Sequence, residues 1–416
     1  MISVRKLSNS WQNGNAKTIT FIVTKDCQLA CKYCYLVGKN SKERMSLEVA
    51  KEAVNYILNN EDYFSDGAVI WDFIGGEPFL EIELIDKICD YIKIEMFRRN
   101  HRWFDSYRFS FTTNGINYHT EKVQNFINKN RNHLSIVITI DGTKEKHDLN
   151  RIWKNQQMGK GIQPKPEEEK GSYNDVIRNI PLWLKQFPHA STKVTIASAD
   201  IPYIKESVLH LYSLGIHQIN INCVFENVWK DGDDKLFEEQ LMSLADAIID
   251  GGYYKDYVCS FYSEHLGKPL EKKLQNQNWC GVGRMLSIDA AGNFYPCTRF
   301  AQYSLRNKKA CIIGNVHDGI NMNLLRPFLT LNRCTQSNQE CLDCEVAEGC
   351  AWCQGENYDA AETNTIYQRA TAICKMHKAR VKANNYYWNK LYRKLELEGQ
   401  REEFEKNKKD INVVIC

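Results

Sequence analysis

Thr24-Lys-Asp-Cys-Gln-Leu-Ala-Cys-Lys-Tyr-Cys-Tyr35 places Cys27, Cys31 and Cys34 in a CxxxCxxC spacing. A cubane iron–sulfur cluster has four irons to ligate, and cysteine-only electron carriers close all four positions. Three thiolates leave one iron open to an external molecule, so this stretch predicts a catalytic cluster. The alternative is a structural zinc knot. It is disfavoured because zinc needs a fourth protein ligand nearby and because the cysteines directly follow an apolar strand, Thr18–Thr24.

With aromatic Tyr33 just before the third cysteine, the stretch resembles the CxxxCxΦC signature of the radical S-adenosylmethionine (SAM) superfamily. The resemblance implies that SAM chelates the open iron through its amino and carboxylate groups. It also implies that the reduced cluster cleaves SAM to a 5′-deoxyadenosyl radical, which abstracts hydrogen from the substrate.

Length and composition set limits on the fold and the compartment. The chain has 416 residues, enough for a barrel-sized unit and a second, smaller unit. Lysine plus arginine (54) nearly balances aspartate plus glutamate (51), which gives no electrostatic argument for a nucleic-acid or membrane partner. Without a signal-type or membrane-spanning apolar run, we expect a cytoplasmic protein, and its 16 cysteines then indicate clusters in a reduced cytosol rather than disulfides.

Alternating apolar runs and amphipathic stretches predict the fold class. The expected strands are 18–24, 68–74, 108–113, 135–140, 193–196 and 218–223, and the expected helices are 47–59, 84–98, 121–128, 174–183, 203–214 and 235–249. This order predicts an α/β fold with a parallel sheet or partial barrel. Together with the resemblance above, it implies a partial (β/α)6 radical SAM barrel, which is followed by a C-terminal, cysteine-rich region. In parallel α/β folds the chemistry lies at the C-terminal ends of the strands, where the first three cysteines fall.

We expect five segments along the chain. They are an N-terminal segment (1–17), the radical SAM partial barrel that the resemblance implies (18–250), a bridging region (251–279), a cysteine-rich domain (280–380) and a helical tail (381–416). The polar stretch 153–171 is expected to form a mobile surface loop, and the tail from 381 to 411 a solvated helix that packs on one aromatic face.

Gly75-Gly76-Glu77-Pro78 follows the second strand. Paired glycines let the backbone approach a ligand closely, and Glu77 supplies an acceptor. The motif resembles the family's GGE motif, which holds the SAM amino group, whereas an ordinary turn would explain the glycines and Pro78 but not the acid.

Two further strand ends carry polar turns, Thr112-Thr113-Asn114-Gly115 and Thr139-Ile140-Asp141-Gly142. By resemblance, Thr113 and Thr139 are expected to contact the SAM nucleoside through their hydroxyls. Arg151 is a candidate for the SAM carboxylate, and its alternative role is that of a solvated surface arginine.

A second cysteine group runs from Cys280 to Cys374. Its pattern is C280-x11-G292-x4-C297, then C341-x2-C344-x5-C350-x2-C353, and finally C374. It resembles the SPASM domain of radical SAM peptide and protein maturases, although the family usually has three residues where this chain has two between the cysteines at 350 and 353. A zinc ribbon is the alternative for CxxCx5CxxC.

The resemblance implies two auxiliary 4Fe-4S clusters and therefore three clusters in all. One would be held by Cys341, Cys344, Cys350 and Cys374, and the other by Cys280, Cys297 and Cys353. The fourth ligand of the second set is left open between Cys311, Cys334, Cys259 and a substrate thiolate, which is a soft ligand suited to iron. Cys89 and Cys223 are expected to be buried packing residues, and Cys416 has no assigned partner.

The resemblance narrows the function to oxidative modification of peptides, with several branches open. Sulfatase-type maturases, which make formylglycine, usually carry an acid after the Gly-x4-Cys cysteine, and here Thr298-Arg299 follows it. Other SPASM enzymes make carbon–carbon bonds. We favour thioether formation in a ribosomally synthesised, Cys-containing precursor peptide, because an open auxiliary site suits a substrate cysteine.

Two partners are expected, the precursor peptide and a reductant. A flavodoxin- or ferredoxin-type protein would supply electrons. Because only 26 residues precede Cys27, we expect the barrel, the SPASM unit, the tail or a separate protein to recognise the peptide leader. The non-enzymatic alternative is an iron–sulfur electron-transfer protein, for which an open cluster beside Gly75-Gly76-Glu77-Pro78 would serve no purpose.

Overall fold

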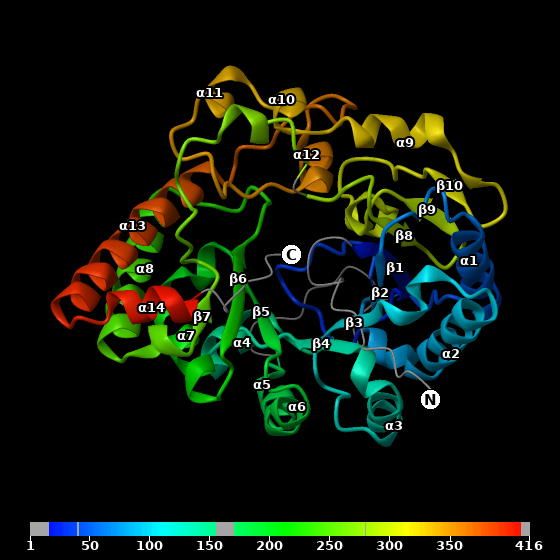
Figure 1. Cartoon of the computed structure of the whole chain (residues 1–416), viewed down its shortest axis with the longest axis horizontal. Helices are drawn as coiled ribbons and strands as arrows, with labels where there is room; N and C mark the ends of the chain where they lie inside the picture. Colours follow the sequence, from blue (N-terminus) through cyan, green and yellow to red (C-terminus); the bar gives the residue numbers. More distant parts are fainter. Residues whose placement is uncertain (1–15, 40, 155–169, 279, 409–416) are drawn as a thin grey trace.

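A computed structural model describes residues 16–39, 41–154, 170–278 and 280–408. Strands β1 to β7 and helices α1 to α8 form an arc with the helices outside it (Figure 1). The strands are β1 (Ala16–Thr24), β2 (Ala68–Gly75), β3 (Tyr107–Thr113), β4 (Leu134–Ile138), β5 (Ser191–Ile196), β6 (Gln218–Cys223) and β7 (Val258–Cys259). The helices are α1 (Leu47–Asn59), α2 (Ile82–Arg98), α3 (Glu121–Asn130), α4 (Lys144–Asn150), α5 (Tyr173–Ile177), α6 (Ile180–Gln186), α7 (Ile204–Ser213) and α8 (Asp233–Asp250).

The C-terminal part spans the opening of this arc, from the β10 side to the α13 side (Figure 1). Its elements are β8 (Leu286–Ile288), β9 (Asn293–Tyr295), β10 (Gly314–Asn315), β11 (Gly319–Ile320), α9 (Met322–Leu329), α10 (Arg333–Gln336), α11 (Gln339–Leu342), α12 (Gln354–Ala360), α13 (Cys374–Leu397) and α14 (Arg401–Lys408).

Two sheets make up the incomplete barrel. One has the order β11-β10-β9-β8-β1-β2-β3-β4 and the other β5-β6-β7. The pairs from β1 to β4 and from β5 to β7 are parallel, and a single bridge between Thr139 and Lys193 links β4 to β5. Strand β8 pairs with β1 in parallel, so the C-terminal part extends the barrel sheet.

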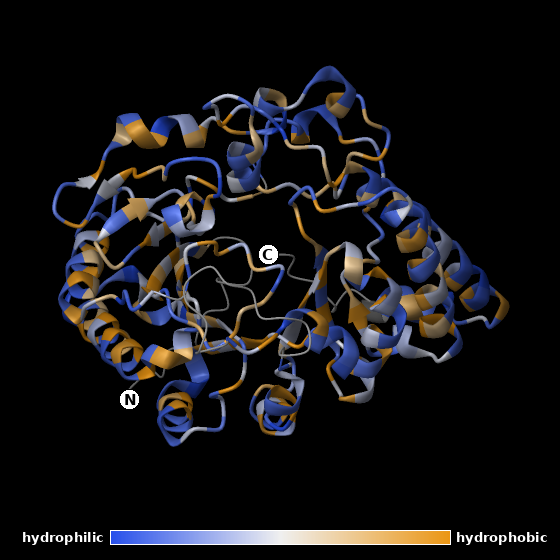
Figure 2. Ribbon diagram, turned by 180° about the vertical axis from the view of Figure 1, so that it is seen from behind, coloured by the Kyte–Doolittle hydropathy of each residue, from blue (hydrophilic) through white to orange (hydrophobic). Residues whose placement is uncertain are grey.

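The core lies between the strands and the surrounding helices. Phe21, Phe73 and Phe111 are fully buried on successive strands, with ring centroids 5.6 and 5.3 Å apart between neighbours. Helix α1 begins at the Ser46 cap, whose hydroxyl accepts from the Val49 amide at 3.1 Å, and it buries one apolar stripe. In Figure 2 the strands are mainly hydrophobic, whereas the helices carry both kinds of residue.

The predicted α/β fold is confirmed, as are the six predicted strands within two residues at each end. Two helix predictions are wrong in detail. The stretch 174–183 forms two helices, α5 and α6, because Pro181 lies in the first turn of α6 and the Asn179 side chain turns to the Gly115 carbonyl (2.8 Å). The tail is likewise divided, because Gly399 adopts φ +66° between α13 and α14.

Helix α13 packs along α8. Its aromatic face is in contact with the rest of the molecule, as predicted, since the ring of Tyr387 stacks on that of Tyr262 with their centroids 4.4 Å apart. The predicted loop 153–171 lies largely outside the described residues. At its ends the Trp153 amide donates to the Lys170 carbonyl at 2.7 Å. Cys416 and the tail beyond 408 also lie outside them. Cys89 is buried within α2 and Cys223 at the end of β6, which confirms both packing predictions.

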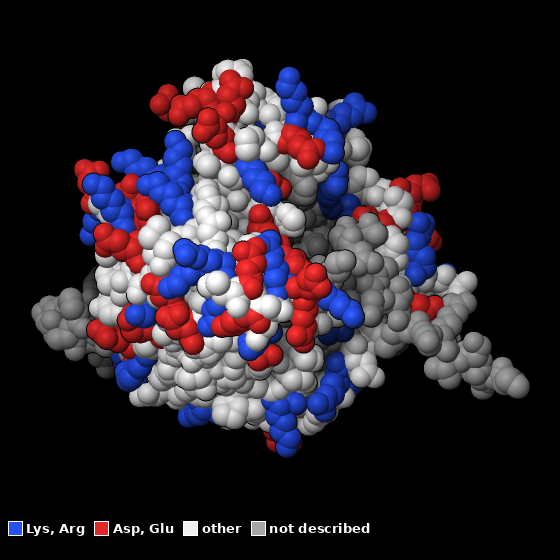
Figure 3. Space-filling model, turned by 60° about the vertical axis from the view of Figure 1, so that its left-hand side comes forward, with Lys and Arg blue, Asp and Glu red and all other residues white. Residues whose placement is uncertain are grey.

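Figure 3 shows a face on which Lys and Arg side chains are interspersed with Asp and Glu. None of the helices in the described ranges is both long and apolar enough to cross a membrane.

Candidate active site

The first cysteine loop leaves β1 and lies against the turn after β2. The Gly76 amide donates to the Thr24 carbonyl at 3.0 Å, and the Glu77 amide to the Asp26 carbonyl at 2.8 Å. A Cβ on Gly76 would lie 2.1 Å from the Asp26 oxygen, and a Cβ on Gly75 would lie 2.2 Å from the Thr24 oxygen. The two glycines therefore allow the cysteine loop itself to approach, a contact that the sequence motif does not reveal.

The three thiols surround the amino group of Lys39, which interacts electrostatically with Cys27, Cys31 and Cys34 and donates to the Leu29 carbonyl at 3.1 Å. Burial raises the pKa of Cys27 to about 12, partly offset by Lys39, and burial also raises the pKa of Cys31. A metal must displace these protons to bind. Three thiols beside one ammonium fit a thiolate-ligated cluster.

Glu77 is buried at the end of β2 and is fully hydrogen-bonded. Its Oε1 accepts from the Thr113 hydroxyl (2.6 Å) and the Phe79 amide (3.0 Å), and its Oε2 accepts from the Asn114 amide (2.7 Å). Burial raises the pKa of the Glu77 carboxyl, and these hydrogen bonds counteract the rise. The carboxylate therefore fastens the end of β3 to the turn after β2.

The predicted threonines lie at neighbouring strand ends. The Thr139 amide donates to the Thr113 carbonyl at 3.0 Å, and both side chains are buried. The Thr113 hydroxyl is already engaged, because it donates to Glu77 and accepts from the Gly115 amide at 3.1 Å. Thr113 thus positions Glu77, a role that its place in the motif did not indicate.

Tyr33 and Arg151 meet beside the first cysteine loop. The Arg151 Nη1 donates to the Tyr33 hydroxyl at 3.0 Å, and this hydroxyl donates in turn to Asp141. Arg151 is 6% exposed, so it is not the solvated arginine of the alternative interpretation. The Arg151 Nε has no hydrogen-bond partner among the described residues. The Arg151 guanidinium also interacts electrostatically with Cys31. A buried, unsatisfied donor of this kind fits an anionic ligand.

The C-terminal cysteines fall into two groups. Cys280, Cys297 and Cys353 interact electrostatically with one another. Burial is the main cause that raises the pKa of Cys280 to about 11, and the neighbouring Cys353 raises it further. Cys341, Cys344, Cys350 and Cys374 form the other group, which is flanked by Arg333 and Arg369. The Arg369 Nη2 lies 3.1 Å from the Cys350 sulfur. These are the two sets that the resemblance implied.

The three candidates for a fourth ligand have other neighbours. Cys259 is buried beside Arg380 and Phe261, Cys311 lies beside the Tyr358 hydroxyl, and Cys334 is exposed beside Gln275. Within the described ranges, no group of three or more His, Cys, Asp or Glu side chains is arranged to hold a single metal ion. In a cubane, by contrast, each cysteine binds a separate iron.

Arg299, two residues after Cys297, joins the two halves of the site. Its Nη2 lies 2.9 Å from Glu226, which follows β6, and 2.9 Å from Glu356 in α12. Its guanidinium also lies 4.7 Å from the ring centroid of Tyr35, the residue after Cys34. Arg306 shares Glu226 at 2.9 Å. No motif in the sequence pointed to this network; only the position of Arg299, close after Cys297, could have indicated it.

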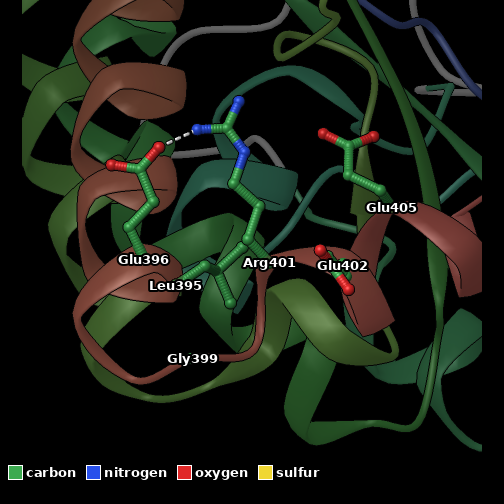
Figure 4. Close-up of a pocket in the computed structure, with 6 residues that line it drawn as sticks. All are labelled: Leu395, Glu396, Gly399, Arg401, Glu402 and Glu405. Carbon is green, nitrogen blue, oxygen red and sulfur yellow. Dashed lines mark hydrogen bonds and ion pairs between the residues drawn. The ribbon is translucent and has the colours of Figure 1, made fainter.

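A surface pocket of about 640 Å³ lies elsewhere, at the turn between α13 and α14 (Figure 4). Arg401 points toward Glu396 there, and its other lining residues include Glu402 and Glu405. None of the predicted cofactor or cluster residues lines this pocket.

Residues 13–158 match a family model described as a 4Fe-4S single cluster domain. Over 307 residues the chain is 31% identical to the uncharacterized protein MJ0907 of Methanocaldococcus jannaschii, an alignment that covers 73% of this chain and 89% of the relative.

Solved structures with a similar fold include native anSMEcpe with bound AdoMet (TM-score 0.62, 18% identity, 91% of this chain and 98% of that one). The same protein with AdoMet and the Cp18Cys peptide gives a TM-score of 0.63 at 19% identity, with the same coverage. Streptococcus suis SuiB bound to its precursor peptide SuiA gives 0.55 at 13% identity and covers 86% of this chain and 76% of that one. At these identities the likeness is one of fold.

Proposed function

We propose that this chain, which belongs to the radical SAM family of enzymes of the SPASM type, forms a sulfur-to-carbon thioether crosslink in a peptide. The observation that carries the proposal is the cysteine arrangement. Three thiols after β1 lie beside a buried arginine with an unsatisfied Nε, and a second group of three, Cys280, Cys297 and Cys353, lies apart from the group of four.

The predicted site residues fall into cluster ligands and SAM contacts. Cys27, Cys31 and Cys34 would hold the first 4Fe-4S cluster. Tyr33, Gly75, Gly76, Glu77, Thr113, Thr139 and Arg151 would form the surroundings of SAM, with Arg151 at its carboxylate. The remaining seven predicted ligands would hold two auxiliary clusters, which makes three clusters in all. When bound, SAM and its cluster supply a radical that takes a hydrogen atom, and the auxiliary clusters supply a one-electron acceptor.

A peptide substrate is supported by the fold neighbours, since anSMEcpe and SuiB have been solved with bound peptides. The crosslink removes one hydrogen from a cysteine thiol and one from a carbon, and one carbon–sulfur bond forms. An auxiliary group with three protein thiols leaves room for the substrate sulfur, a soft ligand for iron. We therefore propose a ribosomally synthesised precursor with a cysteine, and a flavodoxin- or ferredoxin-type reductant in the cytoplasm.

The first test concerns the radical chemistry. Anaerobically reconstituted protein should contain three 4Fe-4S clusters and release 5′-deoxyadenosine from SAM when reduced. Replacing Cys27, Cys31 and Cys34 together with Ala should remove about one cluster's iron and abolish this release, because the proposed SAM-binding residues, Arg151 among them, lie beside this cluster and not beside the auxiliary ones. Cys89→Ala is the matched control, since that thiol is buried in α2. Release that persists in the triple variant would contradict the assignment.

The second test concerns the product. A precursor peptide encoded beside the gene should become about two mass units lighter per crosslink, and its linked cysteine should resist alkylation. Replacing that cysteine with Ser should prevent the modification. Formylglycine in the product would instead place the chain in the sulfatase-type branch, and a carbon–carbon crosslink would place it in a third branch.

A further inference from the structure

A buried ionic network runs from α4 toward the first cysteine loop. The Lys146 side chain is 0% exposed, and its Nζ donates to the Thr195 carbonyl at 2.7 Å. The same nitrogen lies 3.7 Å from Asp141 and 3.6 Å from Asp200, two carboxylates that are also completely buried. Burying these charges is costly unless each keeps its partner, so the three groups depend on one another.

Asp141 connects this network to Tyr33. One carboxylate oxygen accepts from the Tyr33 hydroxyl, and the other accepts from the Thr195 amide at 3.3 Å. The Tyr33 hydroxyl then accepts from Arg151 at 3.0 Å. An unbroken chain of contacts thus leads from Lys146 through Asp141 and Tyr33 to the guanidinium.

The guanidinium of Arg151 has no carboxylate in direct ion-pairing contact among the described residues. Across the described ranges, none of the Asp or Glu side chains lies within the 4.0 Å ion-pairing distance of it, because Asp141 is committed to Lys146 and Tyr33. Asp200 is likewise committed, to Lys146, to the Asn150 amide group (2.6 Å) and to the Ala197 backbone amide (2.8 Å). A buried cation without a carboxylate partner is arranged to receive an anion from outside the protein.

We infer that Asp141 and Lys146 are positioning residues for SAM. They act through Tyr33, holding Arg151 in the arrangement that leaves its Nε free for the carboxylate of the methionyl end. The inference rests on the proposed function, because that function supplies the carboxylate-bearing ligand.

The test measures SAM binding to the anaerobically reconstituted full chain by isothermal titration calorimetry, beside iron content and the electron paramagnetic resonance spectrum of the reduced protein with and without SAM. Asp141→Asn, Tyr33→Phe and Lys146→Met should each weaken SAM binding about tenfold and reduce the SAM-induced spectral change, with iron content retained. Lys144→Met is the matched control on the same helix, since Lys144 is exposed and paired with Asp148.

A double-mutant cycle separates positioning from a general loss of structure. If Asp141 acts through Arg151, then Asp141→Asn combined with Arg151→Gln should bind SAM about as weakly as Arg151→Gln alone. Additive losses, or unchanged SAM binding in both Asp141→Asn and Tyr33→Phe, would overturn the inference. If Lys146→Met does not fold, the near-isosteric variants Asp141→Asn and Tyr33→Phe still test the inference. Wild-type protein that does not bind SAM would instead overturn the proposed function.

Discussion

Glu77 has a structural role that the structure describes, and a role in binding SAM is proposed for it. Its three donors come from Thr113, Asn114 and Phe79, so the carboxylate links the ends of β2 and β3. Both strand ends carry predicted SAM contacts. Removing the carboxylate therefore leaves buried donors unpaired at the place where the cofactor is expected.

We predict that Glu77→Ala weakens SAM binding while iron content stays unchanged, because Glu77 holds no metal. The unpaired donors should also lower the free energy of unfolding by about 1–3 kcal/mol. Calorimetry with SAM, iron analysis and thermal unfolding measure the three effects. Glu83→Ala removes an exposed carboxylate paired with Lys122 and serves as the control. Unchanged SAM affinity in Glu77→Ala would reduce the motif to a turn.

At the level of elements, the turn after β2 and the cysteine loop after β1 share one backbone contact. Gly76→Ala should disturb it, because the new methyl group would meet the Asp26 carbonyl at 2.1 Å. We expect less iron in the first cluster and slower SAM cleavage. Gly67→Ala, at a position with no atom within 4 Å, should have neither effect. Normal iron content in Gly76→Ala would show that the loop can shift without losing the cluster.

The strands of the barrel were predictable because β1 to β6 combine apolar runs with polar turns at their ends. Strand β8 escaped prediction because a three-residue strand has no periodicity, although the Asp289–Gly292 turn, with Gly292 at φ +79°, marks its hairpin. The break between α5 and α6 was readable from Pro181. Lys146 was not predictable, since a lysine in the polar helix α4 looks solvated, and Asp200, which neutralises it, lies 54 residues later.

At the level of the whole molecule, Arg299 ties the barrel to the C-terminal part. Glu226 and Glu356, both largely buried, lose this partner in Arg299→Met, and an unpaired buried carboxylate typically costs about 3–5 kcal/mol. We predict a clear drop in the unfolding temperature. Arg178→Met removes only an exposed pair with Asp175 and should change stability by about 1 kcal/mol or less. Equal unfolding temperatures would show that Arg306 alone neutralises the two acids.

The parallel pairing of β1 with β8 also has a consequence for biosynthesis. β1 leaves the ribosome early, but one of its two neighbours is encoded after Leu286, so one edge of β1 stays open while most of the chain is made. Open strand edges recruit other chains, and pairings this distant in sequence form slowly. Until β8 has been synthesised, the nascent protein is therefore prone to aggregation through β1 and to oxidation at the adjoining thiols. A cell that makes it must protect both during this time.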